Sequence, residues 1–273
     1  MLAVMATVVE HYERSDALAN VRAALDRIAP DGRQLGIDEL AGFDHFHTAG
    51  VLATERMAEL LAPTPADTVL DAGAGLGGPA RYLAARFGCR VVGIDLTPLF
   101  VDVGRLLSVR TGFDGLVDLQ VGDVTEMELE TGSIDHVWTQ HVAMNIADQP
   151  KLYTEIHRVM KPGGHFVLFD VIDGGGGELL LPVPWATEPH HSFLVTRDAL
   201  RCLIEAAGFR IEVDEDPAPE LLPAMQKMLE ASPPAGGLTT AMFIDDVETK
   251  GPRYMQNLAE GRTALALMSC TAV

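Results

Sequence analysis

The sequence predicts an α/β fold in which a largely parallel β-sheet is covered by helices on both faces. Short apolar runs with strand character alternate with helical segments from about residue 68 to residue 214, which is typical of parallel strands joined by crossover helices. The first of these runs, Val69-Leu70-Asp71, breaks into the glycine-rich turn Gly73-Ala74-Gly75-Leu76-Gly77-Gly78 just before a helix begins at Pro79. Such a turn lets a ligand approach the main chain beside the free N–H groups of a helix.

Each element follows from a local pattern. Apolar residues recur at helical spacing from Val9 to Ile28, and a second helix over residues 53–61 is expected to end before Pro63. Two of the helices between the strands are expected over residues 151–159 and 197–207. The first six strands are predicted at residues 68–71, 90–95, 117–121, 134–139, 166–170 and 209–214.

The later part of the chain departs from this alternation. Two helical segments, residues 218–231 and 246–257, lie between the sixth strand and a last one at residues 263–272. We interpret residues of about 216–260 as a helical lid inserted between strands 6 and 7. Residues 1–62 are expected to form an N-terminal helical cap, and residues 63–273 the ligand-binding domain.

The acidic residues at the predicted strand ends indicate the ligand. Asp95 ends the second strand, roughly 20 residues after the turn, which is the spacing of the ribose-binding acid in nucleotide-binding βαβ units. Asp71 would repel a pyrophosphate at the helix N-terminus, which argues against a dinucleotide. A ligand with an ammonium group and a sulfonium tolerates an acid there. The sequence therefore favours S-adenosylmethionine.

Several further motifs accompany the turn. They are Phe43-Asp44-His45-Phe46-His47-Thr48-Ala49-Gly50, Val121-Gly122-Asp123-Val124, Asp135-His136-Val137-Trp138-Thr139-Gln140-His141 and Arg158-Val159-Met160-Lys161-Pro162-Gly163-Gly164-His165. With them the chain resembles class I S-adenosylmethionine-dependent methyltransferases, in particular the small-molecule enzymes related to sarcosine and dimethylglycine N-methyltransferases. The resemblance implies a Rossmann-like seven-stranded sheet whose last strand returns antiparallel at the sheet edge.

The expected contacts with the cofactor are these. Asp95 fits bidentate binding of the ribose hydroxyls, and Asp123 fits the adenine amino group, with the Val124 N–H on a ring nitrogen. By resemblance, the Gln140 carbonyl accepts from the cofactor's ammonium group, and His47 lies at its carboxylate end. The full predicted set is Phe46, His47, Asp71, Gly73, Gly75, Asp95, Leu96, Asp123, Val124, Gln140 and His141.

Methyl transfer from a sulfonium mainly requires alignment and exclusion of water, although an oxygen acceptor also needs a base. His141, beside the expected methyl group, is the first candidate, either as a base or as a group that only orients its neighbours; Asp170 and His191 are the others. The candidates for acceptor binding are Tyr12, Met144, Asn145, Trp185 and His190. No metal is expected, because His45 and His47 have no evident further ligands in the sequence.

The composition of the chain indicates which classes of partner it does not bind. A net charge of -19 argues against nucleic acid and against an anionic membrane surface. The apolar start of the chain is too short to span a bilayer, and three cysteines without a CxxC pair indicate a reduced, cytoplasmic protein.

We expect a monomer or homodimer that transfers a methyl group to N, O or C of a small-molecule metabolite. The alternative is an S-adenosylmethionine-binding enzyme repurposed for a reaction such as cyclisation.

Overall fold

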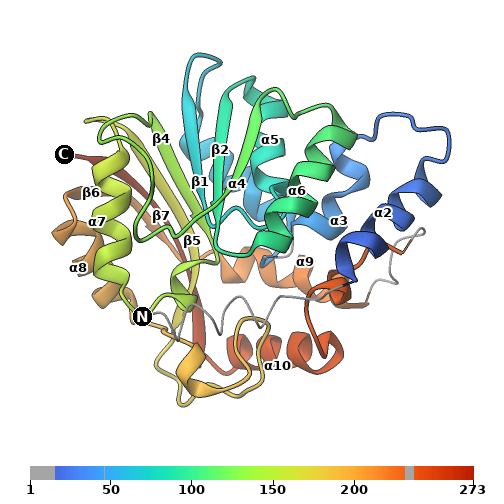
Figure 1. Cartoon of the computed structure of the whole chain (residues 1–273). Coiled ribbons are helices and arrows are strands. Elements are labelled where there is room, and N and C mark those ends of the chain that lie inside the picture. Colours follow the sequence, from blue (N-terminus) through green and yellow to red (C-terminus); the bar gives the residue numbers. More distant parts are fainter. Residues whose placement is uncertain (1–15, 46, 231–236) are drawn as a thin grey trace.

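Seven strands form one mixed sheet in the order β3-β2-β1-β4-β5-β7-β6 (Figure 1). The computed structural model describes residues 16–45, 47–230 and 237–273. The strands are β1 (Thr68–Ala72), β2 (Arg90–Asp95), β3 (Val117–Val121), β4 (His136–Gln140), β5 (His165–Asp173), β6 (Phe209–Glu215) and β7 (Thr263–Ala272). All are parallel except β7, which pairs antiparallel with both of its neighbours.

The predicted antiparallel last strand is confirmed, but its predicted position at the sheet edge is wrong. β7 lies between β5 and β6, with its residues Thr263 to Thr271 paired along the whole of β5. The strand is buried along nearly all of its length, which suits an interior strand covered on both faces. β6, in which exposed and half-buried residues alternate, forms the edge instead.

The helices before and between the strands are α2 (Ala17–Ile28), α3 (Ala41–Asp44), α4 (Val51–Leu61), α5 (Gly78–Phe87), α6 (Pro98–Thr111), α7 (Gln149–Val159), α8 (Arg197–Ala206), α9 (Ala218–Glu230) and α10 (Val247–Ala259). α5 and α6 end at Gly88 and Gly112, whose positive φ angles of 71° and 74° are those of glycine caps. Helices α9 and α10 lie between β6 and β7, where the sequence predicted an insertion. The division at residue 62 stays a prediction.

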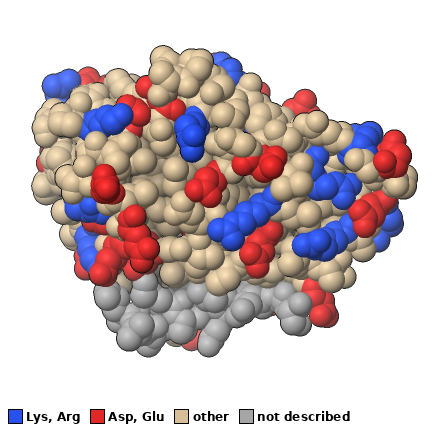
Figure 2. Space-filling model, turned by 45° about the horizontal axis from the view of Figure 1, so that its top comes forward, with Lys and Arg blue, Asp and Glu red and all other residues tan. Residues whose placement is uncertain are grey.

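Charged side chains of both signs are mixed on the face of the molecule that Figure 2 shows. On the face shown in Figure 2, lysines and arginines alternate with aspartates and glutamates and form no continuous basic stripe. This face therefore lacks the electrostatic footprint of a nucleic-acid site. In the part of the chain that the structure describes, no helix combines the length and the apolar character that crossing a membrane requires.

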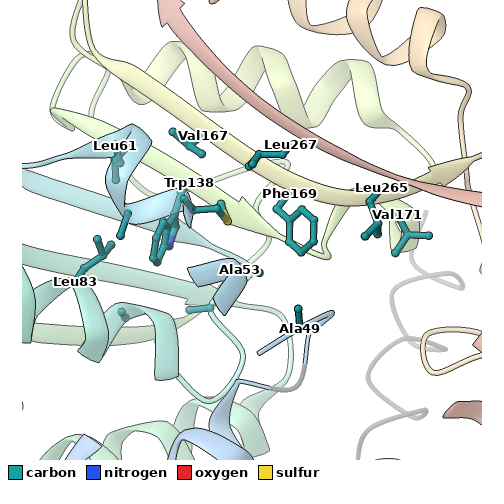
Figure 3. Close-up of a cluster of buried hydrophobic side chains, with 14 of the residues drawn as sticks. Ala49, Ala53, Leu61, Leu83, Trp138, Val167, Phe169, Val171, Leu265 and Leu267 are labelled. Atoms are coloured by element: carbon teal, nitrogen blue, oxygen red, sulfur yellow. The ribbon is translucent and has the colours of Figure 1, made fainter. Parts of the chain in front are cut away.

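Buried apolar side chains cover both faces of the sheet. One cluster joins the sheet to α4, α5, α6, α9 and α10, and a second joins it to α7 and α8. In the first, Trp138 of β4 lies beside Leu61 of α4 and Leu83 of α5 (Figure 3). A third cluster packs α2 and Phe43 of α3 against α6. The N-terminal helices are thus held by the core rather than set apart from it.

A buried arginine connects these layers. Arg81 of α5 is fully buried and donates to Asp44 Oδ2 at 2.8 Å and to the Leu76 carbonyl at 2.7 Å. Its other terminal nitrogen donates to the Gly104 carbonyl at 3.1 Å and to Ser108 Oγ at 3.2 Å, both on α6. One side chain therefore joins α3, the glycine-rich turn, α5 and α6.

Replacing Arg81 with methionine is expected to lower the free energy of unfolding by about 3–5 kcal/mol, because it leaves Asp44 buried and uncompensated. Urea denaturation measures this change. Adding Asp44→Leu to Arg81→Met should restore part of the loss, since the pair then becomes apolar. The control is Arg110→Met, whose ion-pair partner Asp26 is exposed and which should cost no more than about 1 kcal/mol. If Arg81→Met and Arg110→Met lowered the free energy of unfolding by similar amounts, the buried Arg81–Asp44 pair would not have the structural role assigned to it here.

Candidate functional site

A cavity of about 590 Å³ opens at the carboxyl ends of β1, β2 and β4. β1 and β4 are neighbours at the point where the strand order reverses, which is where open α/β sheets bind ligands. The structure brings together at this cavity all the predicted cofactor residues that it describes, and one of the predicted acceptor residues. They are His47, Asp71, Gly73, Gly75, Asp95, Leu96, Asp123, Val124, Gln140, His141 and Asn145.

The glycines of the turn are required by close approach and by backbone angle. Gly73 has a φ of 85°, and a Cβ there would lie 2.3 Å from a methyl carbon of Val142. A Cβ on Gly78 would lie 2.4 Å from the backbone oxygen of Asp44. The turn therefore packs directly against the loop after β4 and against α3, and side chains there would push both away.

Asp95 is built into the turn that it follows. Its Oδ2 accepts from the Gly75 N–H and its Oδ1 from the Thr97 N–H, both at 2.9 Å. Each carboxylate oxygen retains a further acceptor position for a ligand. Asp123, half-buried after β3, is fixed in a similar way by the Thr125 N–H at 2.8 Å.

Asp71 is enclosed at the carboxyl end of β1. The side chain is buried, and its Oδ2 has no hydrogen-bond partner among the described residues. Burial raises the pKa of this carboxyl group to about 7. A cationic donor in the cavity would stabilise its charged form.

Two histidines meet at one hydroxyl group beside the cavity. Thr54 Oγ1, fully buried on α4, lies 3.0 Å from His45 Nδ1, 3.2 Å from His47 Nε2 and 3.4 Å from Gln140 Nε2. Desolvation lowers the pKa of both imidazoles to about 3, so both rings are neutral at pH 7. Thr54 has one hydrogen to donate, so at least one of the rings must present an N–H to it.

His141 occupies the end of β4 with a strained backbone. Its φ is 55°, and its N–H donates to the Phe169 carbonyl at 2.8 Å. The ring lies 5.1 Å from the Phe169 ring and 6.1 Å from that of His47, and Nε2 is buried with no hydrogen-bond partner in the described part of the chain. Burial lowers the pKa of His141 well below its usual value. The side chain thus brings a neutral nitrogen to the cavity.

The remaining predicted residues do not line this cavity. Asp170 is buried on β5 and accepts from the Ala143 N–H at 2.9 Å. Met144 is buried beside it, and Trp185 packs edge-on against Tyr254 and donates to Ser192 Oγ at 2.9 Å. His191 has a buried Nε2 that meets no hydrogen-bond partner within the described ranges, while His190 is exposed beside Glu188. The predicted contacts of Tyr12 and Phe46 lie outside the described residues.

Sequence reasoning missed Asp44, Thr54 and Arg81. Asp44 lines the cavity itself, and the other two hold residues that do. A signal was present: Arg81 falls on the face of α5 that also carries Gly78 and Ala84, and an arginine on a helix face of small apolar residues implies a buried acid. Which acid supplies the partner cannot be read from spacing.

The described lining of the cavity is acidic. It contains no lysine or arginine, and its aspartates are Asp44, Asp71, Asp95, Asp123 and Asp148. Such a lining favours a ligand that carries positive charge. Within the described ranges, no group of three or more histidine, cysteine or acidic side chains is placed to hold a metal ion.

The buried titratable groups predict how stability depends on pH. Histidines with lowered pKa values bind protons only after unfolding, so they destabilise the fold as the pH falls below about 6.5. Burial raises the pKa values of Asp71 and Asp170 to about 7, so between about pH 7 and 4 these groups bind more protons in the folded state than in the unfolded state. In this range they stabilise the fold as the pH falls and oppose the effect of the histidines.

The substitution Asp71→Asn removes one of the two carboxyl groups that oppose the loss of stability at low pH. The free energy of unfolding should then fall more steeply on acidification from about pH 6.5 to 4.5, by up to about 1.4 kcal/mol per pH unit. Urea denaturation at several pH values measures the slope, with the exposed Asp102→Asn as the matched control. Equal slopes in Asp71→Asn and the unmodified protein would mean that Asp71 titrates alike in both states.

Comparison with known proteins agrees with this geometry. Residues 70–168 match the family model described as a methyltransferase domain. The chain is 32% identical over 172 residues to a sterol 24-C-methyltransferase of Eremothecium gossypii, a match covering 57% of this chain and 43% of the relative. It is 33% identical over 117 residues to a sarcosine/dimethylglycine N-methyltransferase of Halorhodospira halochloris, which covers 42% of each protein. The chain thus spans less than half the length of these relatives.

Solved structures share the fold over nearly the whole chain. The geranyl diphosphate C-methyltransferase of Streptomyces coelicolor A3(2) superposes with a TM-score of 0.71 at 20% identity, covering 99% of this chain and 98% of that one. The cyclase SpnF has a TM-score of 0.66 at 19% identity, covering 94% and 93%. The segment with the glycine-rich turn, Asp95, Asp123 and His141 is therefore similar in sequence to a methyltransferase domain, and the chain shares the fold of the solved methyltransferases.

Proposed function

We propose that this chain is an S-adenosylmethionine-dependent methyltransferase that acts on a small-molecule metabolite. The observation that carries the proposal is a set of buried polar atoms with no hydrogen-bond partner among the described residues, all on residues around one cavity: Asp44 Oδ1, Asp71 Oδ2, Gln140 Oε1 and His141 Nε2. Leaving such an atom unpaired costs roughly 1–3 kcal/mol. Three of the four are acceptor oxygens, so the fitting ligand donates hydrogen bonds and carries positive charge.

The remaining lining suits the other parts of this cofactor. Asp95 offers two carboxylate oxygens, each already oriented by a backbone N–H, to the two ribose hydroxyls. Asp123 lies one strand further along the sheet edge, where it would accept from the adenine amino group. Leu96, Val124 and Gly73 supply the close, largely apolar walls that the rings require.

When bound, the cofactor supplies a methyl group already activated on a sulfonium. The chain's own residues then have to position an acceptor and exclude water. The neutral His141 Nε2 can hold a hydroxyl or amine hydrogen, or accept it as the acceptor reacts. His47, whose ring lies edge-on to His141, limits the space available to that acceptor.

The acceptor atom is the variable part of the proposal. The two relatives are named for transfer to a sterol carbon and to the nitrogen of sarcosine or dimethylglycine. We propose N, O or C of a small metabolite as the acceptor atom, of which these two relatives support C and N. We also propose a cytoplasmic location, which the free thiols of Cys89, Cys202 and Cys270 support, and a monomer or homodimer.

The direct test combines the purified chain, S-adenosylmethionine and a panel of amine, phenol and alkene acceptors. Release of S-adenosylhomocysteine that depends on an acceptor supports methyl transfer. Tight cofactor binding without release, together with rearrangement of an acceptor at constant mass, would instead show the cyclisation alternative. Absence of cofactor binding would contradict both.

Asp95→Ala is expected to weaken S-adenosylmethionine binding about tenfold or more, because two ribose hydroxyls lose a charged acceptor worth roughly 1.5–3 kcal/mol. Isothermal titration calorimetry measures the affinity. The matched control is Asp118→Ala on β3, an exposed residue outside the cavity lining, which should bind normally. Unchanged affinity in Asp95→Ala would remove this residue from the site.

His141→Ala separates two roles for this side chain. If it accepts a proton, turnover should fall about 10²–10⁴-fold with little change in cofactor affinity. If it only positions the acceptor, the loss should lie mainly in KM, and His141→Gln, which keeps a hydrogen-bonding group, should recover most of it. Full activity in both variants would exclude His141 from the reaction.

A further inference from the structure

The side chain of Asp44 has one oxygen fixed and one free. Asp44 is the last residue of α3 and is 4% exposed, although it lines the cavity. Its Oδ2 accepts from Arg81 Nη2 at 2.8 Å. Its Oδ1 is buried and has no hydrogen-bond partner among the described residues. A buried carboxylate oxygen in this condition needs a donor, and the cavity is where one can come from.

The surroundings prevent Asp44 from finding that donor by moving. Its backbone oxygen lies so close to Gly78 that a Cβ there would be only 2.4 Å away. Its partner Arg81 is fully buried and is also held by the Leu76 and Gly104 carbonyls. The free oxygen is therefore held in place before any ligand arrives, which lowers the entropy cost of binding.

The charges around Asp44 Oδ1 favour the binding of a cation. The ring of His45 comes to 3.8 Å from Oδ1, but desolvation lowers its pKa to about 3, so it stays neutral at pH 7. Arg81 shares its positive charge among several acceptors on α3, the turn and α6. Asp71 adds a second buried side chain to the same cavity, and its Oδ2 has no hydrogen-bond partner among the residues that the structure describes.

We propose that Asp44 Oδ1 binds the α-ammonium group of S-adenosylmethionine, an inference that rests on the function proposed above. Of the two cationic groups of this cofactor, the ammonium has three N–H donors, whereas the sulfonium has none. An orphaned acceptor oxygen is satisfied only by the first. Arg81 is the positioning residue that presents Asp44 to it.

Three ligands that differ at these groups test the assignment. S-Adenosylmethionine has the ammonium and the sulfonium, S-adenosylhomocysteine has only the ammonium, and 5′-methylthioadenosine has neither. In Asp44→Asn, calorimetry should show at least tenfold weaker binding of the first two and a change of less than twofold for the third. Asp26→Asn, at an exposed surface pair, is the control and should bind all three normally. Circular dichroism checks the fold, and Asp44→Ser replaces Asp44→Asn if the latter does not fold.

The other outcomes overturn the assignment in separate ways. An equal loss for all three ligands means that Asp44 only supports the structure of the cavity. A loss for S-adenosylmethionine alone assigns the residue to the sulfonium, and no loss removes it from the site. Failure of the unmodified protein to bind any of the three would instead contradict the proposed function, independently of Asp44.

Discussion

The buried ion pair between Arg81 and Asp44 is the interaction on which the site depends. Taking both charges out of water costs several kcal/mol, and this cost is offset only because Arg81 also donates to two carbonyls and a hydroxyl. The pair joins α3 to the first turn of α5 and to α6. The end of α3 and the segment after it thereby become a wall of the cavity at the strand ends.

The cavity has a rigid lining that includes buried polar atoms with no hydrogen-bond partner among the described residues. Backbone N–H groups fix Asp95 and Asp123, and packing fixes His141 and Gln140. Several side-chain oxygens and one imidazole nitrogen of this lining have no hydrogen-bond partner in the part of the chain that the structure describes. The protein fixes the positions of these atoms before a ligand binds, so they select a ligand whose hydrogen-bonding groups match them. Such preorganisation favours alignment, which is most of what methyl transfer asks of an enzyme.

Much of this was readable from the sequence because it depends on local patterns. β2 and β3 have the predicted bounds, and the glycine turn and the acids after β1, β2 and β3 meet as expected. The position of β7 was not readable, since strand order depends on pairing between distant segments. The partnership of Asp44 with Arg81, 37 residues apart, was missed for the same reason. Asp170 was predicted for catalysis, but its carboxylate holds the Ala143 backbone instead of lining the cavity.

The central place of β7 also sets the order in which the chain can assemble. β6 has no neighbour in the sheet other than β7, so it cannot dock until residues 263–272 have left the ribosome. Until then the exposed side of β5 has unpaired N–H and C=O groups, as does β6, and both can recruit strands from other chains. Synthesis of α9 and α10 prolongs that interval by the whole length of the insertion. The chain is therefore exposed to aggregation while α9, α10 and β7 are being translated.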